Sequence, residues 1–151
     1  MNIEESKNLA FDALGYLYSL ISATLRKDML AVDLLEKNNF SKSTLVHSSL
    51  AISTHIYNSL DTKNKEKFID YFTNDFENNI FYNCVLTSNE DQYILYETIE
   101  ILSKSKKDSK TIILPILLYL VSLKADMLNK EPIEYSKELC KSIQYIKNSD
   151  F

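Results

Sequence analysis

Glycine is nearly absent from this chain, and its scarcity constrains the fold more than any other feature. The 151 residues contain one glycine and two prolines. Folds built from β-strands use these residues in tight turns and bulges, whereas helical folds need them mainly at helix ends. The sequence also lacks sustained strict alternation and the Asn-Gly or Asp-Gly turns of hairpins. It therefore predicts an all-α fold.

Apolar residues recur at three- and four-residue spacing along most of the chain, as amphipathic helices require. The first such stretch, from Ile3 to about Lys37, predicts one long helix or two nearly collinear helices broken at residues 26–28. Ser41 is expected to cap the next helix, and Asp61 or Thr62 the one after it. The apolar stripe of the helix after Ser41 comprises Leu45, Ser49, Ile52, Ile56 and Leu60.

The second half of the chain shows the same pattern. Ser88 followed three residues later by Asp91 resembles a capping box and predicts a helix from that point. Residues 112–121 form an uninterrupted apolar run, which is too short for a membrane span of about 20 residues and indicates a buried core helix.

The two prolines bear on where the last two helices begin. Pro115 leaves two alternatives: its helix starts at about Pro115, or it starts at Ser109 and bends at the proline. Pro132 suits the first turn of the last helix. Together the segments predict six to eight helices in a single domain, residues 1–151.

The remaining composition indicates the setting of the protein. Cys84 and Cys140 lie far apart among apolar neighbours, which favours two buried reduced thiols over a disulfide. The N-terminus lacks the basic start and apolar run of a signal peptide, so we expect a cytoplasmic protein. Basic residues are almost all lysine, with Arg26 the only arginine, which favours an AT-rich bacterial or phage genome.

Most common enzyme signatures are missing from the sequence. Because Gly15 is the only glycine, the chain has no Gly-rich phosphate loop and no nucleophile elbow. His47 and His55 lie about 12 Å apart along one helix, too far to share a metal ion. We therefore expect no metal and no cofactor. Gly15 itself falls inside a helix, where we expect another helix to pass closely.

One short segment is basic, namely Lys104, Lys106, Lys107 and Lys110. Such a loop can contact phosphate groups, but the net charge is -4, the pI is about 5.2 and a single arginine leaves little capacity for bidentate contacts. The cluster therefore indicates a solvated loop between helices, with nucleic-acid contact expected only within a larger assembly.

An excess of aromatic residues marks residues 68–82. These residues are Phe68, Tyr71, Phe72, Phe76, Phe81 and Tyr82. On one helix they would point almost all round, so either the segment is central to the fold or part of it faces a partner. If the pairs at residues 74–75 and 78–79 interrupt the helix, Phe76, Phe81 and Tyr82 become candidates for a protein interface.

The leading functional hypothesis is a non-enzymatic helical protein that acts by protein-protein interaction, as an adaptor, inhibitor, immunity-type factor or small subunit of an assembly. Its partner would be another protein or a second copy of the chain, and we expect no membrane contact. One alternative is a small-molecule-binding or enzymatic domain with a tyrosine-lined pocket. The other is a nucleic-acid-associated subunit that uses the Lys104 to Lys110 loop.

Overall fold

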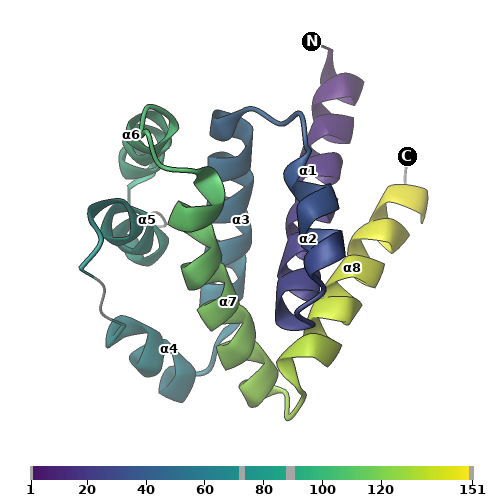
Figure 1. Cartoon of the computed structure of the whole chain (residues 1–151). Coiled ribbons are helices and arrows are strands. Elements are labelled where there is room, and N and C mark those ends of the chain that lie inside the picture. Colours follow the sequence, from purple (N-terminus) through teal and green to yellow (C-terminus); the bar gives the residue numbers. More distant parts are fainter. Residues whose placement is uncertain (1, 72–73, 88–90, 150–151) are drawn as a thin grey trace.

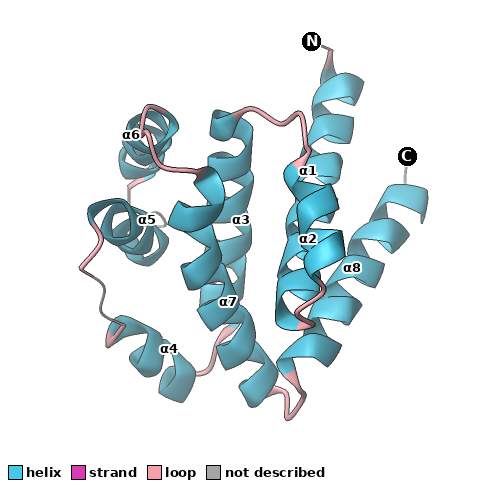
Figure 2. Ribbon diagram, in the orientation of Figure 1, coloured by secondary structure: helices cyan, strands magenta, loops and turns pink. Residues whose placement is uncertain are grey.

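The computed structural model describes residues 2–71, 74–87 and 91–149, and among these the side chains of residues 6, 7 and 144–149 are left out. All regular structure in these ranges is helical, as Figure 2 shows, which confirms the predicted all-α class with its six to eight helices. The helices are α1 (Ile3–Leu25), α2 (Met29–Glu36), α3 (Lys42–Ser59), α4 (Thr62–Ile69), α5 (Phe76–Thr87), α6 (Gln92–Ser103), α7 (Ser109–Met127) and α8 (Pro132–Ser149).

Short polar side chains begin several of these helices, because each accepts a hydrogen bond from a backbone N–H that has no partner within the helix. Ser41 caps α3 and Asp61 caps α4, as predicted. Asp91 caps α6 itself, rather than occupying the third position of a capping box. Ser88, the expected cap, lies outside the described residues.

The chain reverses direction after α1, so the expectation of two nearly collinear helices was wrong, although the break falls at the predicted residues. Lys27 has a φ of 58°, in the left-handed region. The backbone N–H groups of Lys27 and Asp28 donate to the carbonyls of Thr24 and Ala23, which closes the C-terminus of α1. Helix α2 then returns along α1 (Figure 1), and Asn38 donates a 3.0 Å hydrogen bond to the Tyr16 hydroxyl.

Helix α7 lies at the centre of the bundle, as the apolar run at residues 112–121 predicted. It packs against α3, with α1, α2 and α8 on one side and α4, α5 and α6 on the other (Figure 1). Its fully buried side chains include Ile112, Ile113, Ile116, Leu117, Leu120 and Val121. Six such residues on one helix supply much of the apolar burial that stabilises the fold.

Pro115 lies inside α7, which begins at Ser109 with Asp108 as its cap, so the start given by the second alternative is confirmed, while the bend at the proline stays a prediction. A proline within a helix removes the N–H that would bond the carbonyl four residues earlier, here that of Thr111. The buried Asn78 of α5 occupies this position: its Nδ2 donates to the carbonyls of Thr111 (3.3 Å) and Ile112 (2.5 Å). Asn78 therefore joins α5 to α7 where the proline weakens the helical ladder.

The last helix starts at Pro132, as predicted, after a second left-handed residue, Asn129, with a φ of 57°. Its inner face includes the buried Ser136 and Ile143. Among the described residues no single helix is long and apolar enough to cross a membrane. Helices α7 and α8 meet that criterion only as a pair bent by 101°.

Candidate functional site

The aromatic segment is mostly interior. Phe81 is fully buried and Tyr82 nearly so, which makes their predicted outward orientation wrong. The reason is local: residues 78–79 do not interrupt α5, because Asp75 accepts a hydrogen bond from the N–H of Asn78 (3.0 Å) and starts one continuous helix. Phe76, the third interface candidate, is 70% exposed. Phe72 lies outside the described residues.

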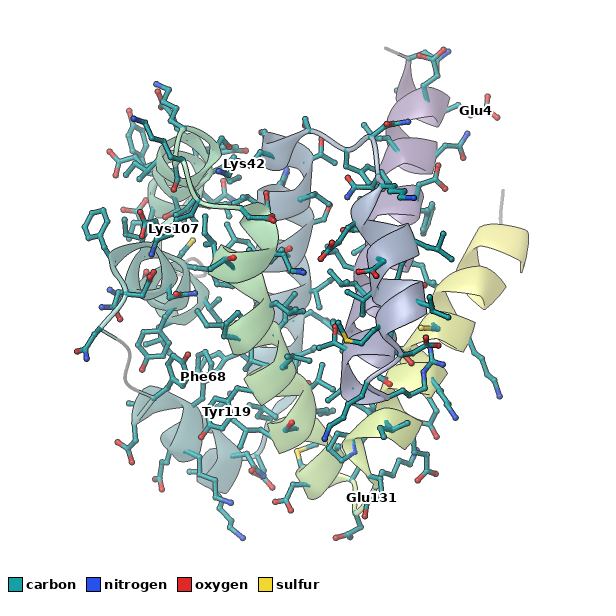
Figure 3. The ribbon with its side chains drawn as sticks, in the orientation of Figure 1. Glu4, Lys42, Phe68, Lys107, Tyr119 and Glu131 are labelled. Carbon is teal, nitrogen blue, oxygen red and sulfur yellow. The ribbon has the colours of Figure 1, made fainter. Side chains whose placement is uncertain are left out.

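The buried aromatic rings pack against one another at the junction of α4, α5 and α7. Phe68 has ring centroids 5.1 Å from Tyr82 and 6.2 Å from Tyr119, and Figure 3 shows Phe68 and Tyr119 side by side. The Tyr82 hydroxyl donates to the carbonyls of Phe68 (3.1 Å) and Ile69 (2.6 Å), so it also closes the end of α4. The Tyr119 hydroxyl donates to the carbonyl of Lys67 (3.2 Å). Tyr82 and Tyr119 therefore have a structural role, because each hydroxyl and each ring has a partner within the chain.

Carboxylates of the same chain pair with most of the basic cluster. Lys104 lies 2.9 Å from Glu100, Lys107 pairs with Asp75 and Glu77, and Lys110 pairs with Glu36. The hydrogen bond from Lys107 lowers the pKa of the Asp75 carboxyl and raises the pKa of the lysine. Lys106 is exposed. Three of the four lysines are thus already neutralised, which leaves little free charge for phosphate contacts.

Both histidines are exposed and line one shallow surface pocket of about 360 Å³ between α3 and α6. Within the described ranges, no group of three His, Cys, Asp or Glu side chains is arranged to hold a metal ion. Both cysteines are free thiols; Cys84 is buried, whereas Cys140 is only half-buried. Burial raises the pKa of each thiol, which favours its protonated form.

A groove of about 510 Å³ lies between α1, α2 and α8, on the other side of the molecule. Small side chains of α1 line it together with leucines of α2 and lysines of α8, which leaves a shallow channel over α1. The lining residues are Ser19, Ser22, Ala23, Arg26, Ala31, Leu34, Leu35, Lys137, Cys140 and Lys141. Its volume falls in the range of about 300–1,000 Å³ that is typical of binding sites.

The polar groups of this groove are mostly cationic. Arg26 donates from Nε to the Ser22 hydroxyl (3.3 Å) and lies 3.5 Å from Asp28. Lys137 and Lys141 are exposed, and neither forms an ion pair with a described residue. Because the chain as a whole carries a charge of -4, this positive site is a local exception. It favours a ligand that is apolar with negative charge.

Helix α2 presents large apolar side chains to solvent beside the groove. The exposed fractions are 64% for Met29, 79% for Leu30 and 68% for Leu34, while Val32 is buried against α1. Asp33 is also exposed and falls between these residues on the helical wheel. We call Met29, Leu30, Asp33 and Leu34 the α2 ridge. The ridge was not predicted from the sequence, although apolar residues on both faces of an eight-residue helix are a usable signal.

No protein family, curated protein or solved structure matches the chain. Any function must therefore be inferred from the geometry of the groove and of the α2 ridge.

Proposed function

We propose that this protein acts by binding another protein chain through the groove between α1, α2 and α8, without catalysing a reaction. The observation that carries the proposal is the α2 ridge: it presents three large apolar side chains, each more than half exposed, and one of them, Leu34, lines an open groove. Contiguous exposed apolar surface of this kind marks interaction sites in soluble proteins.

The energetics support a protein ligand. Each buried CH₂ group contributes roughly 0.8 kcal/mol, so covering Met29, Leu30 and Leu34 supplies a substantial apolar term. Two helices that flank a channel over a third also offer a seat for one more helix, which is a common mode of peptide recognition. The cations at Lys137 and Lys141 would orient the ligand and select against basic partners.

The test is site-specific photo-crosslinking in the native cells. A photo-reactive amino acid at Leu30 should give a discrete covalent adduct with a protein. The matched control is the same amino acid at Tyr96, which is 65% exposed on α6, on the far side of α7. An adduct at position 30 but not at position 96 supports the proposal.

A second variant separates binding from folding. Leu34→Asp places a charge at the edge of the groove and should abolish the adduct at position 30, while circular dichroism keeps its helical signal. Absence of any adduct at position 30, or an adduct that Leu34→Asp leaves intact, would contradict binding at this groove.

A further inference from the structure

We infer that the groove between α1, α2 and α8 receives the α2 ridge of a second copy of this chain, in a two-fold symmetric dimer. The inference rests on the proposed function, because it names the occupant of the same groove. In a two-fold interface the same surface serves both copies, so it must be complementary to itself. A projecting element and the cavity that accepts it must therefore lie next to each other.

The ridge and the groove meet this requirement. Leu34 belongs to both: it lines the groove and stands at one edge of the ridge. On the helical wheel Asp33 lies four residues from Met29 and three from Leu30, so an acid occupies the middle of an apolar face. A helix with this face matches an apolar channel that carries cations.

The charges of the ridge and of the groove are also complementary. No described residue forms an ion pair with Asp33, and the same holds for Lys137 and Lys141. When the ridge of one copy enters the groove of the other, Asp33 approaches the lysines of α8 there. The symmetry repeats the contact, which gives two acid-base contacts per dimer.

The other carboxylate on the solvent side of α2 is already engaged. Glu36 pairs with Lys110 of α7, on the flank of α2 away from the groove. Asp33 is therefore the acid that α2 has free for an intermolecular contact. A second copy thus supplies both the apolar surface and the negative charge that the groove favours.

The experiment is a charge exchange followed by sedimentation equilibrium and light scattering. The wild-type chain should approach twice its monomer mass of 17.5 kDa as concentration rises. Asp33→Lys alone, and Lys137→Glu with Lys141→Glu, should each raise the dissociation constant at least about tenfold, because like charges then face each other. An equimolar mixture of the two variants should restore the dimer, since both contacts in the mixed dimer join opposite charges.

A control pair makes changes of charge of the same sign elsewhere. Glu97→Lys and Lys106→Glu alter exposed residues of α6 and the following loop, and should leave the mass of the wild-type dimer unchanged. Circular dichroism verifies the fold of each variant. Should Asp33→Lys fail to fold, the double lysine variant, whose substitutions lie on α8, tests the same contact alone.

Three results would overturn the inference: a wild-type monomer across a roughly hundredfold concentration range, charge variants that dimerise like wild type, or a mixture that stays monomeric. The proposed function fails differently, because it requires an adduct at position 30 with any protein. A monomeric chain that still forms such an adduct refutes the dimer and leaves the proposed function standing.

Discussion

Similar kinds of apolar residue lie on the two sides of the central helix α7, but the two sides bury them to different extents. On the α4–α5 side, Phe68 and Phe81 are fully enclosed, and Asn78 bonds the backbone of α7. On the α1–α2–α8 side, a groove remains open and the leucines at positions 30 and 34 face solvent. The junction of α4, α5 and α7 is packed within one chain, although Ile69 and Phe76 at its margin are exposed, whereas the second side presents large apolar side chains of α2 beside an open groove.

The difference comes from the number of neighbours that each helix has. Helix α5 packs against α3, α6 and α7, so nearly every direction around it is occupied. Helix α2 has eight residues and packs mainly along α1, so residues opposite Val32 have nothing to bury them. Whether an apolar side chain is buried thus depends on tertiary contacts more than on the residue type.

The sharpest test of this comparison truncates large side chains on both sides. Phe81→Ala should lower the free energy of unfolding by about 3–5 kcal/mol, because it leaves a cavity in a packed region. Leu30→Ala on α2, and Phe76→Ala at the exposed start of α5, should each change it by less than about 0.5 kcal/mol in the monomer. Urea denaturation measures all three. A cost below about 1 kcal/mol for Phe81→Ala would show that the aromatic side is loosely packed.

The next largest effect concerns the contact between α5 and α7. Asn78→Ala should lower the free energy of unfolding by about 1–3 kcal/mol. It leaves the buried carbonyl of Ile112 without its second donor and the carbonyl of Thr111 without a donor. In a Pro115→Ala background the cost should be smaller, since an alanine N–H can bond the Thr111 carbonyl. A double-mutant cycle by urea denaturation measures the coupling. Equal costs in both backgrounds would contradict this role of Asn78.

The sequence was sufficient for those parts of the fold that local chemistry decides. Helix caps at Ser41 and Asp61 and the buried run at residues 112–121 follow from short-range hydrogen bonding and apolar spacing. The reversal after α1 could not be predicted, because it depends on a lysine in the left-handed region, where glycine is the usual residue. The pairing of Asn78 with the helix that contains Pro115 depends on two segments meeting in space.

The candidate site was missed for a related reason. The density of aromatic residues made Phe81 and Tyr82 candidates for an interface, yet aromatic residues become buried wherever helices surround them. The groove combines Ser19, Leu34 and Lys137, which come from three helices and are individually unremarkable in the sequence. Because α2 has only eight residues, the neighbouring helices can cover few of its apolar side chains. This short length follows from the turn at Lys27, which the sequence did not predict.

A smaller effect of opposite sign tests how loosely the α1–α2–α8 side is filled. We expected a helix to pass close to Gly15 of α1, and this was wrong: a Cβ atom there would meet nothing within 4 Å. Gly15→Ala should therefore raise the free energy of unfolding, by up to about 1 kcal/mol, because alanine favours a helix over glycine at no steric cost. Thermal and urea denaturation measure the gain. A loss of stability would indicate that the position is more crowded than the structure shows.

The smallest effect is electrostatic and concerns Asp75, which precedes α5 and pairs with Lys107 of the basic cluster. Asp75→Asn keeps a side-chain oxygen to cap α5 but removes the charge that pairs with Lys107. The Asp75 pKa is lowered by the hydrogen bond from Lys107 and next by the N–H of Asn78, so its folded value lies below the unfolded value of about 3.9. The carboxylate thus stabilises the fold above that unfolded pKa, and the contribution is lost as pH falls through the folded pKa.

Urea denaturation should show wild type more stable than Asp75→Asn at about pH 7, with the difference closing in acid and shrinking with added salt. In a Lys107→Gln background the difference at neutral pH should also shrink, and a difference that persisted there would assign the effect of the Asp75 charge to the N-terminus of α5 rather than to Lys107.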